Sequence, residues 1–374
     1  MRIRSLPVPV SAALLVVYLL VVVGRPVAKR EVATLGSMAV GVGVHYRRLH
    51  LPDSGIYTLG AYGDTVAWGA DPAGGLVNSV IDTASLRTGQ IRVAAHVHPS
   101  TPQLNFVRIS ARWLSWVEYE PPTGDWRLMA QSRAGGQPFE VDSSVAEGGR
   151  SLPPPLVPLT SMDGDTLAWS FSVDLGRPKA RTGVWVQVLP HGIKHLVANS
   201  MAPCYVIWPA VSGRVVVWDH EGACAAGNSD LMEADWHTGR TRTLSQDHRS
   251  SEPETNGRLV AYKAGVRFGP GALALLDLRT GRSRIVDPHG TADRPVLTDR
   301  LLAWMTADEQ TIIAQDLGSG KQYVLSQNSP NHTVHYVLNG HLGQGWSDEV
   351  VLTQLSGTYP APPDKEDIVT AMVP

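Results

Sequence analysis

A short motif that recurs about every 45 residues constrains the fold of this chain more than any other sequence feature. In each copy a turn-forming residue comes about five positions before an aromatic residue that closes an apolar, β-rich run. An example is Ser212-Gly-Arg-Val-Val-Val-Trp218. The seven aromatic anchors are Trp68, Trp116, Trp169, Trp218, Tyr262, Trp304 and Trp346, at spacings of 48, 53, 49, 44, 42 and 42 residues.

A second signal follows each anchor. Thr-Gly or a similar pair ends at Gly89, Gly239, Gly281 and Gly320, between apolar runs, which predicts a hairpin turn. Weaker equivalents lie at 135–136, 191–192 and 356–357. In three repeats an Asp stands four residues before the glycine, where its carboxylate can accept hydrogen bonds from turn amides. These residues are Asp235, Asp277 and Asp316.

The repeat predicts an all-β architecture. Runs such as Leu259–Tyr262 are too short for core helices and are bounded by turn residues, so each repeat forms one small sheet. Such a sheet buries both faces only by stacking against its neighbours, and radial stacking gives a β-propeller. We interpret the aromatic anchors as wedges between blades. Seven anchors favour seven blades; six blades, with one degenerate repeat absorbed elsewhere, is the alternative.

We assign residues 45–374 to the propeller. The segments 45–51 and 56–59 have strand-like patterns, whereas the C-terminal repeat is short. We therefore expect these N-terminal strands to complete the last blade and close the ring, which removes exposed sheet edges.

The N-terminus predicts a membrane-targeting helix. Val8 to Val23 is almost wholly apolar, with Arg2 and Arg4 before it and Arg25, Lys29 and Arg30 after it. We assign residues 1–30 to a single-pass signal anchor, followed by a linker at 31–44, with the propeller outside the cytoplasm. Cleavage as a signal peptide and secretion is the alternative.

The chain has two cysteines, Cys204 and Cys224. In an exported protein this pair is expected to form a disulfide. The bond would close a loop of about 20 residues and contribute ~3 kcal/mol of stability in the chain-entropy model. Two separate buried thiols are the alternative.

Charge and motifs narrow the function. Lys and Arg total 32 against 34 Asp and Glu, which gives no basic excess for nucleic-acid binding. The sequence has no Gly-x-Ser-x-Gly elbow, no His-Glu-x-x-His motif and no phosphate-binding glycine loop. We therefore assign no catalytic, cofactor-binding or metal-binding residue, and no cofactor.

Two groups of residues leave alternatives open. His96 with His98, and His332 with His335 and His341, could bind a metal, although exposed loop positions explain the first pair and no acidic partner accompanies the second group. Trp126 and Trp236 lie next to predicted turns, where they could stack on a sugar or anchor a protein. Burial between blades is the alternative for both tryptophans.

The repeats resemble those of TolB-like propellers. The residues that carry the resemblance are Ser212 to Asp219 with Asp235-Trp-His-Thr-Gly239, together with Asp277-Leu-Arg-Thr-Gly281 and Asp316-Leu-Gly-Ser-Gly320. The resemblance covers about residues 55 to 357. It implies the fold and an extracytoplasmic setting. TolB has an additional N-terminal α/β domain, which residues 25–50 are too few to form, so a role in the Tol system is not implied.

Propellers of this group act as binding platforms, as lids on peptidases and occasionally as lyases. We therefore expect a membrane-anchored, non-catalytic binding or scaffold module for an envelope protein or a glycan. A propeller enzyme, such as a polysaccharide lyase or glycan hydrolase with its site at the channel mouth, is the alternative.

Overall fold

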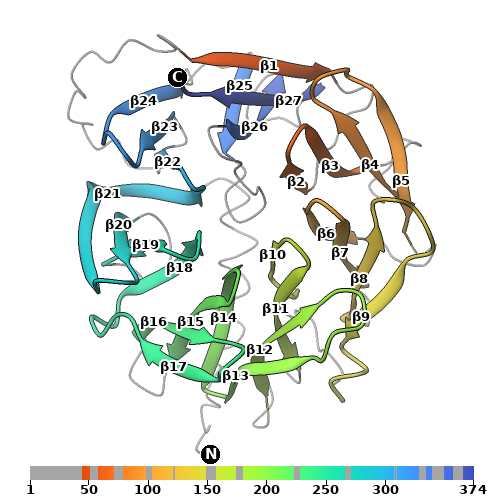
Figure 1. Cartoon of the computed structure of the whole chain (residues 1–374), viewed down its shortest axis with the longest axis vertical. Coiled ribbons are helices and arrows are strands. Elements are labelled where there is room, and N and C mark those ends of the chain that lie inside the picture. Colours follow the sequence, from red (N-terminus) through yellow and green to blue (C-terminus); the bar gives the residue numbers. More distant parts are fainter. Residues whose placement is uncertain are drawn as a thin grey trace, which may run out of the picture.

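The computed structural model describes residues 44–50, 58–70, 79–97, 103–120, 123–148, 157–173, 180–222, 228–265, 271–306, 308, 310–327, 334–338, 349–356 and 365–374. Within these ranges every regular element is a β-strand, and all neighbouring strands in the sheets run antiparallel. The sheets follow one another around a ring (Figure 1). The fold is therefore an all-β propeller.

The first four sheets have four strands each. Sheet 1 contains β2 (Leu59–Tyr62), β3 (Thr65–Ala70), β4 (Val80–Ser85) and β5 (Ile91–His96). Sheet 2 contains β6 (Gln103–Ile109), β7 (Trp113–Glu120), β8 (Asp125–Ser132) and β9 (Phe139–Ser143). Sheet 3 contains β10 (Thr160–Asp163), β11 (Thr166–Val173), β12 (Arg181–Val188) and β13 (His195–Met201). Sheet 4 contains β14 (Cys204–Ser212), β15 (Val215–Gly222), β16 (Asn228–Asp235) and β17 (Arg240–Thr243).

The last two sheets differ in size. Sheet 5 has seven strands: β18 (Ser250–Thr255), β19 (Leu259–Ala264), β20 (Gly271–Asp277), β21 (Arg282–Leu297), β22 (Leu301–Thr306), β23 (Thr311–Asp316) and β24 (Gln322–Gln327). Sheet 6 has the order β1 (His45–His50), β27 (Lys365–Met372), β26 (Glu349–Ser356) and β25 (Val334–Leu338).

The blade count corrects the sequence prediction. The described strands form six hydrogen-bonded sheets, so the prediction of seven blades is wrong and the alternative of six applies. The physical reason is β21, which continues for 16 residues. Its first part pairs with β20, and its last part, from Ala292 to Leu297, pairs with β22. Two sequence repeats therefore share one strand and merge into one sheet.

Most of the described aromatic anchors lie between neighbouring sheets, and Trp304 lies between the two repeats of sheet 5. Trp116 on β7 is fully buried and packs in a cluster with Ala67 and Ile81 of sheet 1. Trp304 packs in a cluster that spans the two repeats of sheet 5, with Leu273 and Leu275. Equivalent clusters hold the remaining described anchors, which are Trp68, Trp169, Trp218 and Tyr262. Trp346 lies outside the described residues.

Strand β1 closes the ring. It pairs with β27 from His45↔Met372 to His50↔Asp367. The second predicted N-terminal segment contributes differently, because Leu59 begins β2 and belongs to sheet 1. Apolar packing continues across both junctions of sheet 6: Leu49 and Ile368 pack with Trp68, and Val369 packs with Leu301.

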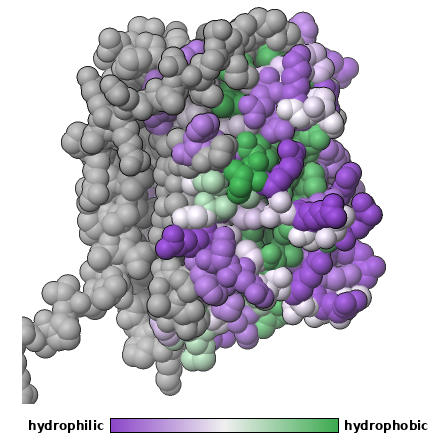
Figure 2. Space-filling model, turned by 90° about the vertical axis from the view of Figure 1, so that its left-hand side faces the viewer, coloured by the Kyte–Doolittle hydropathy of each residue, from purple (hydrophilic) through white to green (hydrophobic). Residues whose placement is uncertain are grey.

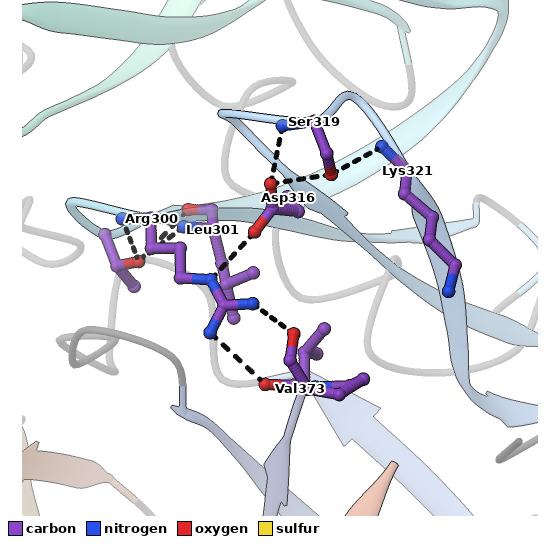
Figure 3. Close-up of polar contacts among 8 residues, drawn as sticks. Arg300, Leu301, Asp316, Ser319, Lys321 and Val373 are labelled. Atoms are coloured by element: carbon purple, nitrogen blue, oxygen red, sulfur yellow. Dashed lines mark hydrogen bonds and ion pairs between the residues drawn. The ribbon is translucent and has the colours of Figure 1, made fainter. Parts of the chain in front are cut away.

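A polar clamp supports this closure (Figure 3). Arg300 donates a 2.7 Å hydrogen bond from Nε to Asp316 Oδ2 and a 3.4 Å bond from Nη1 to the carbonyl of Val373, and it also contacts Pro374. Asp316 Oδ1 in turn accepts a 2.7 Å bond from the Ser319 amide. Arg300 therefore links a turn of sheet 5 to the end of the chain beside β27.

The predicted Asp turns are confirmed. Asp235 accepts bonds of 3.0 Å from the amides of His237 and Thr238, and Asp277 accepts one of 2.8 Å from the Thr280 amide. These amide donors hold the pKa of Asp235 and Asp277 below the usual range. The pKa of Asp316 is lowered for the same reason, with further help from Arg300.

Several predictions fall on other parts of the chain. The apolar segment 8–23 lies outside the described residues, as do Cys224 and all of the predicted linker 31–44 except residue 44. No helix long and apolar enough to cross a membrane occurs in the described ranges. Cys204 opens β14 opposite Gly222 of β15, which is two positions before Cys224 in the sequence. The disulfide stays a prediction.

Candidate functional site

The innermost strands share an irregularity. In β6, β14, β18 and β21 two residues stand opposite a single residue of the next strand, at 106–107, 208–209, 252–253 and 294–295, so the pairing register shifts by one residue at each bulge. Phe106, Trp208 and Glu252 begin three of these bulges and have positive φ angles of 49°, 54° and 53°. A non-glycine residue in this conformation costs about 1–2 kcal/mol, and such strain is concentrated at functional sites.

Two amides at the bulges, those of Val107 and Glu252, are bonded to side chains of the preceding sheet. In three of the four bulges the second residue is Pro209, Pro253 or Pro295, which has no N–H to satisfy. In the remaining bulge Val107 takes this position, and its amide donates a 2.9 Å bond to Thr58 Oγ1. The Glu252 amide donates a 3.0 Å bond to Asp219 Oδ2 of sheet 4. The bulges therefore help to join neighbouring sheets.

Charged residues gather beside the bulges, and we call them the inner-wall charges. They are Arg108, Asp219, Glu252, Glu254 and Lys263, on strands of sheets 2, 4 and 5. Lys263 is 1% exposed, and its Nζ lies 2.6 Å from Glu252 Oε1. Arg108 is also buried, and its Nε donates a 2.8 Å bond to the Thr160 carbonyl of sheet 3.

One interaction reaches across the ring. Burial lowers the pKa of Arg108 to about 10, and the negative charge of Glu254 opposes that shift. Arg108 lies on β6 and Glu254 on β18, and these strands stand on opposite sides of the ring axis (Figure 1). The two side chains are therefore within electrostatic reach of each other across the middle of the molecule.

The chemistry open to this inner wall follows from these contacts. Asp219 and Arg108 hydrogen-bond to the main chain of the next sheet, and Glu252 pairs with Lys263. The first two bonds join neighbouring sheets, and the Glu252–Lys263 pair joins two strands of sheet 5. No three His, Cys, Asp or Glu side chains gather closely enough in the described part of the chain to hold a metal ion.

A second buried charge cluster lies between sheets 2 and 3. Lys194 Nζ lies 2.8 Å from Asp142 Oδ1 and 2.5 Å from Glu147 Oε1, and it stands 4.3 Å from the centre of the Trp185 ring. The Trp169 Nε1–H donates a 2.7 Å bond to Asp142. Burial raises the pKa of Asp142, whereas Lys194 and Trp169 act to lower it. Because Lys194 directly precedes β13, the cluster links the start of β13 to β9 of sheet 2.

Next to this cluster, sheet 3 presents an apolar outer edge. Eight large hydrophobic side chains are exposed among the described residues, and four of them lie on β12, β13 and their connecting turn. We call these four the outer apolar edge: Val188, Ile193, Leu196 and Met201. Ile193 is 78% exposed. Elsewhere, on the side of the ring where β21 lies, hydrophilic residues cover most of the described surface (Figure 2).

The residues that the sequence singled out have other positions. Trp126 and Trp236 are buried, so the alternative of burial between blades is confirmed for both. Trp236 donates a 3.0 Å bond from Nε1 to the Gly213 carbonyl. His96 is exposed at the end of β5, while His98, His332 and His341 lie outside the described residues. No described contact brings these histidines together.

Sequence reasoning missed both the inner-wall charges and the outer apolar edge. A signal for the first was present: Trp208, Glu252 and Arg294 each stand ten residues before an aromatic anchor and directly before a proline. The outer apolar edge had no comparable signal. The alternation of apolar and polar residues along an outer strand does not show which of its two faces is covered by a neighbouring sheet and which is exposed.

Comparisons with known proteins agree on the fold. No protein-family model matches the chain. No curated protein matches it either. Solved structures that resemble it include TolB from Acinetobacter baumannii and other β-propellers, and those with TM-scores of 0.50 and 0.55 confirm the predicted β-propeller fold. The TolB match has 13% identity and a TM-score of 0.43, and covers 83% of this chain and 78% of TolB.

Two enzymes give higher TM-scores. An oligogalacturonate lyase in complex with manganese has 12% identity and a TM-score of 0.55, over 88% of this chain and 91% of the lyase. A prolyl endopeptidase has 10% identity and a TM-score of 0.58, over 87% of this chain and 51% of the peptidase. At these identities the likeness shows the fold alone, and the fold is shared by proteins with and without catalytic activity.

Proposed function

We propose that this chain is a non-catalytic binding module that its N-terminal apolar segment holds at the membrane, with the propeller outside the cytoplasm. The observation that carries the proposal is the outer apolar edge, which supports a protein as the partner. Four exposed aliphatic or thioether side chains on one strand pair are typical of a surface that another protein covers. A glycan partner would instead be expected to stack on exposed aromatic rings.

The energetics favour this surface. Covering a side chain such as Leu196 or Ile193 gains about 25 cal/mol for each Å² of apolar area removed from water. A few such residues at the centre of an interface commonly supply most of the binding free energy. β13 is also the outermost strand of sheet 3, so its free edge can pair with an added strand.

The inner-wall charges support a non-catalytic role. Asp219 and Arg108 form hydrogen bonds that join one sheet to the next, and the Glu252–Lys263 ion pair joins two strands of sheet 5. A general acid or base needs a proton-exchanging atom directed at a substrate. The alternative, a propeller lyase or hydrolase, is favoured only by the convergence of Arg108 and Glu254 across the ring.

The binding test compares the full chain with two variants. Wild-type protein, Leu196→Asp and the control Ile285→Asp are used to capture proteins from envelope extracts and to probe a glycan array. Ile285 is also exposed, but it lies on β21. We expect at least tenfold weaker protein capture by Leu196→Asp and unchanged capture by Ile285→Asp. Equal capture by all three proteins would contradict the proposal.

A polysaccharide cleavage assay tests the alternative that the chain is an enzyme. Polysaccharides that contain uronates are incubated with wild-type protein and with Glu254→Gln, and chain cleavage is followed by the release of reducing ends. No cleavage is the expected result. Cleavage that the Glu254→Gln substitution abolishes would establish the enzyme and overturn the proposal.

Membrane attachment is tested separately. The expressed chain should sediment with membranes and retain residues 1–23 by mass spectrometry. A soluble form that starts near Arg25 would contradict the anchor and support secretion.

A further inference from the structure

A cleft between sheets 1 and 2 brings two arginines together. Its volume is about 160 Å³, and its lining includes Arg92 of β5, Gln131 of β8 and the turn residues Arg133 to Gly135. Gln131 Nε2 donates a 3.0 Å bond to the Ala94 carbonyl, which joins β8 to β5 beneath the cleft. The two walls are therefore held at a fixed separation.

Arg133 is fixed at this junction by three bonds. Its Nη1 donates to the Ser110 carbonyl at 2.7 Å and to the Ala111 carbonyl at 3.4 Å, and its Nη2 donates to Thr65 Oγ1 at 2.7 Å. A guanidinium has five N–H donors, so two remain. Arg92 is more exposed, and its Nε donates a 3.3 Å bond to Thr83 Oγ1.

No carboxylate among the described residues forms an ion pair with either arginine. Burial is the main cause that lowers the pKa of Arg133. The positive charge of Arg92 lowers this pKa further, and the phenol of Tyr62 acts to raise it. The cleft therefore holds two like charges close together, an arrangement that a bound anion would stabilise.

We propose that this cleft is a binding site for an oxyanion group, either the carboxylate of an acidic sugar or an inorganic phosphate or sulfate. The planar N–H forks of Arg92 and Arg133 match the paired oxygens of such groups. The volume is enough for one such group, since a water molecule occupies about 30 Å³. The mouth is open at Gly135, where nothing lies within 4 Å of the position a Cβ would take. The site is separate from the outer apolar edge, so this proposal does not depend on the proposed function.

The test is a calorimetric titration of the full chain in detergent, at constant ionic strength, with sodium phosphate, sodium sulfate or sodium glucuronate. Glucose is the neutral control. The variant Arg92→Gln removes one fork without touching the three bonds of Arg133. Its matched control is Arg87→Gln, on the same sheet, whose side chain is 81% exposed and lies outside the cleft lining.

We expect saturable binding of at least one oxyanion, at least tenfold weaker in Arg92→Gln and within twofold of wild type in Arg87→Gln. The anion that binds most tightly among phosphate, sulfate and glucuronate identifies the ligand group as a sugar carboxylate or an inorganic ion. Absence of saturable binding in all three arms would overturn the proposal, as would equal affinity in the two variants.

Discussion

The inner wall of the ring and the outer edge of sheet 3 use opposite chemistry. At the inner wall, charged side chains such as Lys263 and Asp219 are buried and bonded to charged or main-chain groups of neighbouring strands. At the outer edge, apolar side chains such as Ile193 and Leu196 are exposed to solvent. In the function proposed above, the charges inside stabilise the ring and the outer apolar edge binds the partner.

The largest effect is expected from breaking the inner wall. Lys263→Met should lower the free energy of unfolding by about 3–5 kcal/mol, because it removes the cation that lies 2.6 Å from the Glu252 carboxylate, whose side chain is only 13% exposed. The double variant Glu252→Gln with Lys263→Met should recover a large part of that loss, because it removes both charges. Urea unfolding measures both values. A loss below about 1 kcal/mol in the single variant would show that this pair does not stabilise the ring.

The predicted disulfide should have the next largest effect. If Cys204 and Cys224 are bridged, Cys204→Ser should lower the free energy of unfolding by ~3 kcal/mol. Alkylation without a reductant should label neither cysteine, and labelling of both would contradict the bridge. Mass spectrometry of the alkylated protein gives the result.

A smaller effect is expected at the turn of Asp316. Because its pKa is lowered in the folded protein, its charge contributes stability above the unfolded pKa of about 3.9. This contribution is lost as the pH falls from about 3.9 toward the lower folded value. Asp316→Asn should cost about 1 kcal/mol at neutral pH and flatten the acid limb of the stability profile. A profile as steep as that of the wild type would contradict this assignment.

The smallest effect on stability is expected at the outer apolar edge. Ile193→Asp and Leu196→Asp should change the free energy of unfolding by no more than about 0.5 kcal/mol, because both side chains are exposed. Thermal unfolding measures the change, with Ile285→Asp as the control. A large loss would mean that this edge packs inside the protein and is not a recognition surface.

The sequence predicted those parts of the fold that local chemistry determines. The anchors and the turns at Asp235, Asp277 and Asp316 were visible because each depends on residues a few positions apart. The blade count was wrong because it took each of the seven anchors to mark a separate sheet, whereas the 16-residue strand β21 pairs with both β20 and β22 and joins two repeats in one sheet. Whether a strand continues there depends on its pairing with β20 and β22, which no local pattern encodes.

The candidate sites were less predictable for a related reason. Arg108 and Glu254 are 146 residues apart in the sequence and interact only because the ring closes. The same holds for Arg92 and Arg133, which come from neighbouring sheets. The proline after Trp208 and Glu252 marked the position of the inner-wall bulges, but not the residues that they would meet.

Site-specific photo-crosslinking in intact cells shows whether a protein binds at the outer apolar edge. A photoreactive residue is placed at Leu196 on the outer apolar edge and, in separate proteins, at Ile285 on β21 and at Val93 on β5, which are also exposed. We expect a discrete protein adduct from position 196 and none from positions 285 and 93. Adducts of equal yield from all three positions, or none from position 196, would contradict the proposed function.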